Sequence, residues 1–133
     1  MIVVDTNILA YLYLPGEHTA RAERLLAREP DWVAPVLWRS EFRNVLAGYL
    51  RRKVLTLDQA RSLQAEAESL MAGGEHDVDS ASVLRLVSQS SCSAYDCEFA
   101  ALAQKLGIKL VTADAGLLKA FPMHAVSLAA ASA

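Results

Sequence analysis

Two short apolar runs in this chain are each followed by an aspartate. The first covers residues 2–4 and is followed by Asp5, and the second covers residues 108–112 and is followed by Asp114. Runs this short, rich in β-branched and apolar residues and bounded by helical patterns, are typical of strands that are buried on both faces of a parallel sheet. Because parallel strands end at one common edge, we expect both aspartates at the edge where open α/β sheets bind their ligands.

The rest of the chain alternates similar strands with amphipathic helices, and no linker, repeat or change of composition divides it. Its 133 residues suit one domain, covering residues 1–133, with a single core. The alternation predicts an α/β fold with a central parallel sheet of about five strands. The expected strands are 2–4, 32–34, 76–78, 109–112 and 125–128. The expected helices are 8–14, 19–28, 36–52, one from a capping box at Thr56 to Gly73, one from an N-cap at Asp79 to Val87, 94–106 and 115–120. Residues 129–133 are small and unpatterned, so we expect a frayed tail there.

The composition is typical of a globular protein and limits where the chain can act. Hydrophobic residues make up 53% and charged residues 21%, and no apolar run is long enough to span a membrane. The first apolar run has no basic leader, so it does not resemble a secretory signal, and we expect a cytoplasmic protein. Cys92 and Cys97 lack zinc-like spacing and are expected to be reduced thiols. The net charge of −2 argues against binding nucleic acid by bulk electrostatics alone, although it does not exclude an enzyme that acts on nucleic acid.

Two further acids lie where a helix is expected to carry apolar residues. Glu41 falls between Leu37 and Val45 in the apolar stripe of the helix 36–52, and Asp96 shares a face with Phe99 on the helix 94–106. An acid in such a stripe costs free energy unless it is paired or bound to a metal. Each of the two could also have an ordinary structural role. Glu41 could reach solvent at the edge of the stripe, and Asp96 could be favoured in the first turn by the helix dipole.

Together the four acids Asp5, Glu41, Asp96 and Asp114 indicate a site for a divalent cation. Asp5 and Asp114 could each serve only as a helix N-cap, but all four acids are also expected at the same sheet edge or inward face. Two carboxylates 4 to 5 Å apart repel each other by roughly 3 to 4 kcal/mol at an effective dielectric of 20. Carboxylate oxygens suit Mg²⁺ or Mn²⁺, whereas the scattered histidines offer no zinc-like spacing.

Four segments of the chain together match a known family: VVDTNILAYL, WRSEFRNVLAGYL, AYDCEFAALAQKLG and LVTAD followed by AGLL. They resemble PIN-domain ribonucleases, and in particular the VapC-type toxins of VapBC toxin–antitoxin pairs. Their order and spacing match over nearly the whole chain. The resemblance implies a single three-layer α/β/α domain that cleaves RNA by in-line attack on phosphorus, with Mg²⁺ or Mn²⁺ activating a water molecule. It also implies a cognate VapB-type antitoxin and a homodimer.

The resemblance assigns roles to individual residues of this sequence. Asp5, Glu41, Asp96 and Asp114 fall on the four acidic positions of the metal site. We expect Asp5 and Asp96 to be direct ligands, with the other two acids binding a second metal or positioning the attacking water. The neighbouring positions, which steady the acids or the metal's waters, are occupied by Thr6, Asn7 and Thr112, although Thr112 could equally be only a β-branched residue at a strand end.

Basic side chains on and after the helix 36–52 are candidates for phosphate contacts with RNA. They are Arg39, Arg43, Arg51, Arg52 and Lys53. The alternative is an ordinary solvated face. Similarly, Trp38, Phe42 and Tyr49 could contact a partner protein or simply form core.

Two other functions compete with that of a nuclease. A catalytically silent module of the same fold could bind RNA or a protein without cleaving, although the intact set of four acids argues against it. A phosphotransfer receiver or an Asp-nucleophile phosphatase would need further acidic or basic residues that are missing here, and no glycine-rich phosphate loop is present.

Overall fold

The computed structural model describes residues 1–133 and contains one five-stranded parallel sheet. The strand order is β3-β2-β1-β4-β5, and every neighbouring pair is parallel. The predicted α/β fold with a central parallel sheet is therefore confirmed. The strands are β1 (Ile2–Val4), β2 (Trp32–Pro35), β3 (Glu75–His76), β4 (Leu110–Thr112) and β5 (Ala125–Ser127). The third strand is shorter and begins one residue earlier than the predicted 76–78.

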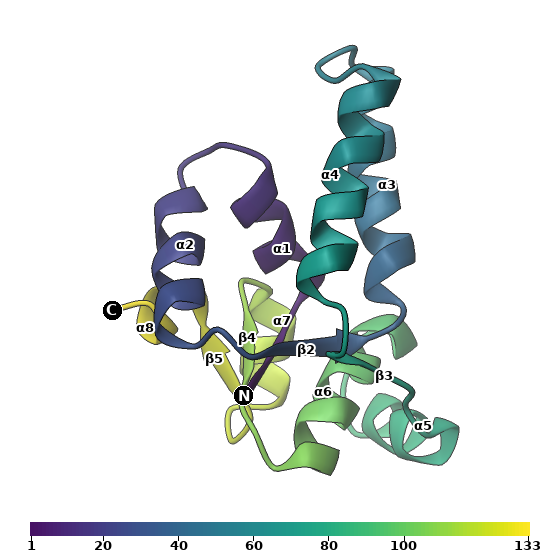
Figure 1. Cartoon of the computed structure of the whole chain (residues 1–133). Coiled ribbons are helices and arrows are strands. Elements are labelled where there is room, and N and C mark those ends of the chain that lie inside the picture. Colours follow the sequence, from purple (N-terminus) through teal and green to yellow (C-terminus); the bar gives the residue numbers. More distant parts are fainter.

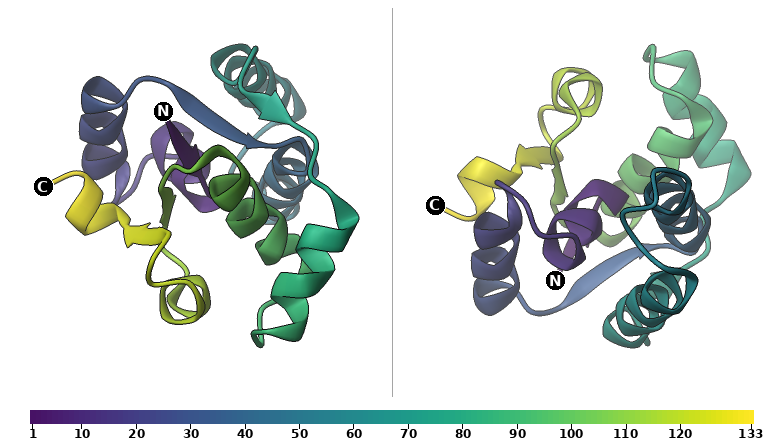
Figure 2. Two further views of the ribbon diagram at one scale, coloured as in Figure 1. Left: turned by 90° about the horizontal axis from the view of Figure 1, so that it is seen from below. Right: turned by 90° about the horizontal axis from the view of Figure 1, so that it is seen from above.

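Helices cover both faces of the sheet and complete three layers. They are α1 (Thr6–Tyr13), α2 (Thr19–Arg28), α3 (Trp38–Arg51), α4 (Leu57–Leu70), α5 (Ser80–Ser88), α6 (Ala94–Leu106), α7 (Ala115–Ala120) and α8 (Leu128–Ala131). Helices α1 to α4 lie on one side of the sheet and α5 to α7 on the other (Figures 1 and 2). This distribution is the one that right-handed crossovers produce when the chain runs from β1 out to β3 and then returns to β4 and β5.

Capping side chains set most helix boundaries. Helix α4 begins with a complete capping box between Thr56 and Gln59, and α6 ends at Gly107, whose φ of 66° is the left-handed conformation that glycine adopts without strain. Helix α1 begins at Thr6 rather than at the predicted residue 8, because the Asp5 side chain accepts a hydrogen bond from the Thr6 amide and caps the helix earlier.

The end of the chain is ordered, so the expected frayed tail at 129–133 is wrong. Residues Leu128–Ala131 form α8, capped by the Ser127 hydroxyl, which accepts from the Ala130 amide at 3.1 Å. Leu128 is buried, and α8 packs against α2 and β5. The Arg28 guanidinium also donates a hydrogen bond to the carbonyl of Ala133. A buried leucine and a serine cap stabilise this short helix, which the run of alanines alone did not indicate.

Two features of the fold position the functional region. Helix α6 packs across β1, β2 and β4, where Phe99 and Leu102 are fully buried. Helices α3 and α4 form a hairpin that projects beyond the sheet, with residues 52–56 at its tip (Figure 1). At the base of this hairpin β3 approaches β2 so closely that a Cβ at Gly74 would collide with the carbonyl of Trp32. None of the helices combines the length and apolar character that crossing a membrane requires.

Candidate active site

The sheet reverses its strand order at β1, and the acids gather beside that point. From β1 the chain proceeds to β2 and β3 on one side, and later places β4 and β5 on the other. The gap between the carboxyl ends of β1 and β4 is therefore the topological switch point, where open α/β sheets bind ligands. Asp5 follows β1 directly, and one residue separates Asp114 from the end of β4. Both aspartates therefore lie at the switch point, as the sequence predicts.

A pocket of about 460 Å³ opens at this edge, and all four predicted acids line it. Asp5 comes from the end of β1, Glu41 from the first turn of α3, Asp96 from the first turn of α6 and Asp114 from the N-cap of α7. Of the three predicted supporting residues, Thr6 and Asn7 also line the pocket, and Thr112 lies beneath it. The remaining lining residues are Leu37, Ser40, Asn44, Val45 and Tyr95.

The Thr112 hydroxyl joins the two aspartates of the sheet edge. It is fully buried, donates to Asp5 Oδ2 at 2.7 Å and accepts from the Asp114 amide at 3.0 Å. Asp5 Oδ1 accepts from the Thr6 amide at 2.8 Å, and Asp114 Oδ2 accepts from the Leu117 amide at 2.8 Å. Both aspartates are thus helix N-caps and pocket residues at once, so the two interpretations of them are compatible.

Glu41 is tied to the same edge through Thr6. The Thr6 hydroxyl donates to Glu41 Oε1 at 2.7 Å, across a sequence separation of 35 residues. Glu41 is half-buried and lies beside the fully buried Phe42 on α3. Its carboxylate is held at the pocket by this hydrogen bond and does not simply extend into solvent.

Burial and mutual repulsion make the acidic cluster unusual. The pKa of Asp5 is raised from 3.8 to about 6, and burial is the largest cause. The hydrogen bonds from Thr112 and Thr6 lower this pKa, whereas repulsion from Glu41 and Asp96 adds to the rise. Burial likewise raises the pKa of Glu41, with Asp96 adding repulsion. The pKa of Asp96 is raised by burial and by repulsion from Asp114. The four charges therefore act on one another as one cluster.

The chain supplies no positive charge to offset this cluster. None of the four acids takes part in any of the ion pairs of the structure, and no lysine, arginine or histidine lines the pocket. The neighbour of the Asp96 carboxylate within the chain is the uncharged hydroxyl of Ser93, which lowers the pKa of Asp96 and also accepts from its backbone amide. Buried acids that lack a basic partner require a cation from outside the chain or a proton.

The donor set fits a hard divalent cation, although the side chains are not arranged around one. Carboxylate, hydroxyl and amide oxygens are the ligands that Mg²⁺ and Mn²⁺ prefer. No group of three or more His, Cys, Asp or Glu side chains in the chain is close enough together to hold a metal ion as the structure stands. Asp5, Glu41 and Asp114 are instead directed toward their hydrogen-bond donors, as expected for like charges without a counterion.

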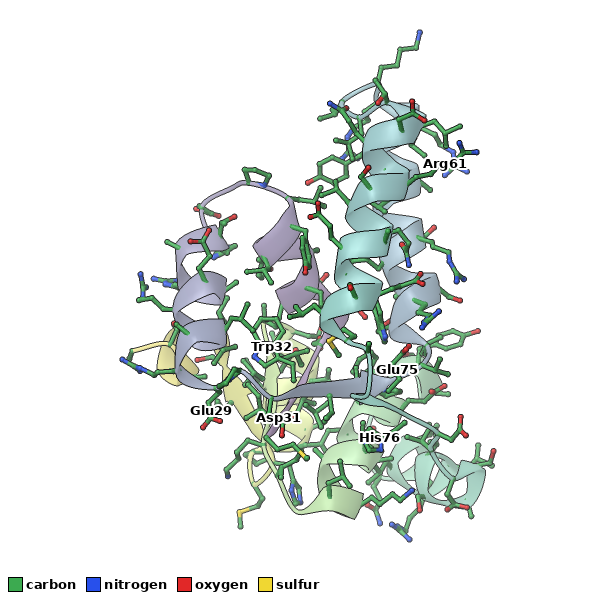
Figure 3. All side chains as sticks on the ribbon, viewed as in Figure 1. Glu29, Asp31, Trp32, Arg61, Glu75 and His76 are labelled. Atoms are coloured by element: carbon green, nitrogen blue, oxygen red, sulfur yellow. The ribbon has the colours of Figure 1, made fainter.

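One of the predicted RNA-contacting residues is engaged elsewhere. Arg39 forms ion pairs with Glu75 at 2.6 Å and with Glu68 at 3.0 Å, linking α3 to β3 and α4. Figure 3 shows Glu75 beside the bases of α3 and α4, on the side of the strand opposite to His76. The guanidinium of Arg39 therefore fixes the hairpin on the sheet, and because two glutamates engage it, Arg39 is not among the phosphate contacts proposed below. Trp38, whose indole donates to Glu75 at 3.0 Å, and Phe42 are fully buried and belong to the core.

Sequence reasoning missed three polar or aromatic residues of the pocket. Ser40 and Asn44 flank Glu41 on α3, and Tyr95 precedes Asp96 on α6. Helical spacing around Glu41 could have found Asn44, which lies three residues further along and so on a neighbouring face. Nothing in the sequence distinguishes Tyr95 from a core aromatic.

The fold and the pocket define a class of protein: a three-layer α/β domain with an acidic, oxygen-lined pocket at its topological switch point. Within that class, the sequence profile of the PIN domain matches residues 2–121, and the chain belongs to the PIN domain family. It is 33% identical over 126 residues to ribonuclease VapC3 of Pyrobaculum aerophilum, covering 91% of this chain and 95% of that protein.

Two solved structures share the fold at low sequence identity. The crystal structure of FitAcB from Neisseria gonorrhoeae superposes with a TM-score of 0.76 at 20% identity, covering 96% of this chain and 98% of that chain. A toxin–antitoxin complex from Klebsiella pneumoniae gives a TM-score of 0.70 at 18% identity, covering 96% of this chain and 98% of that one. The likeness extends over almost the whole length of each chain.

Proposed function

We propose that this protein is a Mg²⁺- or Mn²⁺-dependent ribonuclease and the toxin of a type II toxin–antitoxin pair. The observation that carries the proposal is the pocket in which Asp5, Glu41, Asp96 and Asp114 meet at the switch point of the sheet without a basic partner. Membership of the PIN domain family and the 33% identity to a ribonuclease over nearly the whole chain support the same activity.

The four acids are the residues that would hold the cation. A divalent ion at such a site lowers the pKa of a bound water and stabilises negative charge that builds up on a phosphate. The chain's own contribution is to hold its ligands: Thr112 fixes Asp5 and the backbone of Asp114, while Thr6 fixes Glu41. Asp5 and Asp96, whose carboxylates repel each other in the pocket, are the proposed direct ligands. Asn7 is exposed at the pocket and offers an amide to a water or phosphate.

The experiment that tests this function is cleavage of a broad panel of single-stranded and structured RNAs with millimolar Mn²⁺, Mg²⁺ or EDTA. We expect cleavage with either metal and none with EDTA, because the four acids repel a phosphate until a cation neutralises them. The products are followed on denaturing gels. Binding without cleavage across the panel would favour a silent RNA-binding module, the alternative against which the intact set of four acids argues.

Basic residues of the α3–α4 hairpin remain the proposed phosphate contacts, without Arg39. Arg43, Arg51, Arg52 and Lys53 are exposed. Arg51 lies ten residues beyond Glu41 on α3, which places it about 15 Å further along the helix axis. Arg52 packs over the ring of Tyr49 at 4.7 Å, which keeps its guanidinium close to the hairpin. RNA that enters the pocket would pass along the basic side chains of this hairpin.

The double variant Arg51→Gln/Arg52→Gln tests whether the basic side chains of the α3–α4 hairpin contact RNA. We expect weaker RNA binding and a slope of log K against log salt that is shallower by about 0.7 for each lost phosphate contact. Fluorescence anisotropy at several salt concentrations measures both quantities. The matched control is Arg21→Gln/Arg24→Gln, which removes two exposed charges from α2. An unchanged slope in the hairpin variant would show that these arginines form only a solvated face.

The partner and assembly predictions follow from the family resemblance. A VapB-type antitoxin could neutralise the pocket by placing a basic side chain among acids that have none of their own. A homodimer is proposed from the family resemblance, and the exposed Val36 and Leu84 beside a hollow of about 370 Å³ are candidate interface residues. We assign all of residues 1–133 to the domain because α8 packs on α2, and a cytoplasmic location fits the two unpaired cysteines.

A further inference from the structure

Tyr95 is the one tyrosine whose aromatic ring has no partner in the chain. The other three have partners: Tyr11 packs against His18, Tyr13 against Phe42 and Tyr49 beneath Arg52. Tyr95 is 63% exposed, and its hydroxyl makes no hydrogen bond within the chain. Tyr95 therefore has no aromatic or cationic partner within the chain, and most of its ring is free to contact a ligand.

The ring stands at a fixed place on the rim of the acidic pocket. Tyr95 lines this pocket and precedes Asp96 in the first turn of α6. That turn is held by the Ser93 side chain, which accepts from the Asp96 amide at 3.0 Å, and by the fully buried Cys97 and Phe99 that follow. Helical side chains lean toward the N-terminus of their helix, so the ring is expected to overhang the open end of α6 beside Asp96.

The pocket is larger than a metal ion and a phosphate require. Its volume of about 460 Å³ is in the range of sites that hold a small organic group. Most of its lining is polar, but Leu37 and Val45, which are partly buried on α3, add apolar surface beside the acids. The site therefore combines carboxylates, which suit a cation and a phosphate, with apolar and aromatic surface, which suits a flat ring.

We infer that Tyr95 stacks on the nucleobase next to the phosphate held at the acids. This inference rests on the proposed ribonuclease function and adds a residue that contacts the substrate. Bases in a duplex are already stacked and paired, whereas unpaired bases can turn out and stack on an aromatic side chain. Such stacking tolerates any base, because every base has a π-face.

The test is RNA binding by the chain with its four acids intact and with Ca²⁺ in place of Mn²⁺, because Ca²⁺ takes the same oxygen ligands in a looser geometry and is expected to hold the RNA without cleaving it. A labelled single strand of about eight nucleotides is titrated, anisotropy is read, and denaturing gels verify that the strand stays intact. We expect Tyr95→Ala to weaken binding by about fivefold to a hundredfold and Tyr95→Phe to change it by less than about twofold. With a matched strand of abasic nucleotides, Tyr95→Ala should bind like the Tyr95 parent, because no base remains to stack.

Met123→Ala is the matched control for lost apolar surface. Met123 is 78% exposed and precedes β5, at the edge of the sheet opposite the pocket. The RNA strand and the abasic strand should therefore both bind Met123→Ala as tightly as they bind the parent protein. Three results would overturn the inference: unchanged affinity of Tyr95→Ala, equal loss with Tyr95→Phe, or equal loss with the abasic strand. A changed oligomeric state of Tyr95→Ala in light scattering would also overturn it, by assigning the ring to a protein interface.

Cleavage by the wild-type chain separates this inference from the proposed function. If the wild type cuts RNA and Tyr95→Ala binds both strands like its parent, the ribonuclease assignment stands and the stacking role fails. If the base-dependent loss is observed but no RNA is cut with any metal, Tyr95 keeps its role and the chain is a binding module.

Discussion

Replacing Asp5 by asparagine is expected to abolish metal-dependent RNA cleavage, with a fall in rate of about a thousandfold or more. Asp5 is the most buried of the four acids and only 6% exposed. It is also the acid that repulsion couples to both Glu41 and Asp96. The substitution removes one negative oxygen from the proposed metal site with almost no change of shape. Initial cleavage rates with saturating Mn²⁺ measure the effect.

The fold should survive this substitution, which separates a lost activity from a lost structure. An asparagine carbonyl can still accept from the Thr6 amide, and asparagine is as good an N-cap as aspartate. The matched control is Glu23→Gln, which neutralises an exposed acid of α2 and should cleave like the wild type. Circular dichroism verifies the fold of both variants. Activity of Asp5→Asn near the wild-type level would contradict the assignment of Asp5 as a metal ligand.

Most of the secondary structure was predictable because its signals are local. Strand β1, helices α2, α6 and α7, and the glycine end of α6 follow from apolar runs, capping side chains and the left-handed preference of glycine within a few residues. The alternation of elements then fixes a parallel sheet. The short helix α8 was missed because its stability depends on burial of Leu128 against segments distant in sequence. A run of alanines does not reveal that contact.

The acids of the candidate site were predictable for a different reason. An aspartate after a buried strand and a glutamate in an apolar stripe both conflict with their local surroundings, and such conflicts mark functional positions. The ion pair of Arg39 with Glu75 was not predictable, because it joins residues that are 36 positions apart and depends on how β3 meets α3. Tyr95 escaped notice because an aromatic residue at the start of a helix does not conflict with its surroundings.

The proposed cluster also predicts how stability depends on pH when no metal is present. Asp5 has a pKa of about 6 in the folded chain against an ordinary value of 3.8, so the folded state holds this proton more tightly than the unfolded state does. The stability that this group contributes is therefore present at low pH and lost as pH rises from about 4 to about 6, a change of about 2 to 3 kcal/mol in the free energy of unfolding. The raised pKa values of Glu41 and Asp96 act in the same direction.

Urea unfolding in EDTA at about pH 4 and about pH 7.5 isolates the part due to Asp5. Glu75 and Asp79 have lowered pKa values and act in the opposite direction, but they are unchanged in Asp5→Asn. The difference between wild type and variant therefore cancels them. Between the two pH values, the variant should gain about 2 to 3 kcal/mol relative to the wild type. If the difference in free energy of unfolding between wild type and variant does not vary with pH, the pKa of Asp5 is not raised in the folded chain.

Adding Mn²⁺ at pH 7.5 should reverse this relation, because a bound cation offsets the charge that burial and crowding disfavour. At a concentration about a hundred times the dissociation constant, the wild type should gain about 2.7 kcal/mol, or about 10 °C in melting temperature. Asp5→Asn should gain much less, while Glu23→Gln should gain as much as the wild type. Equal shifts in all three proteins would mean that Mn²⁺ binds outside the pocket, and the acids would then have to tolerate one another by protonation alone.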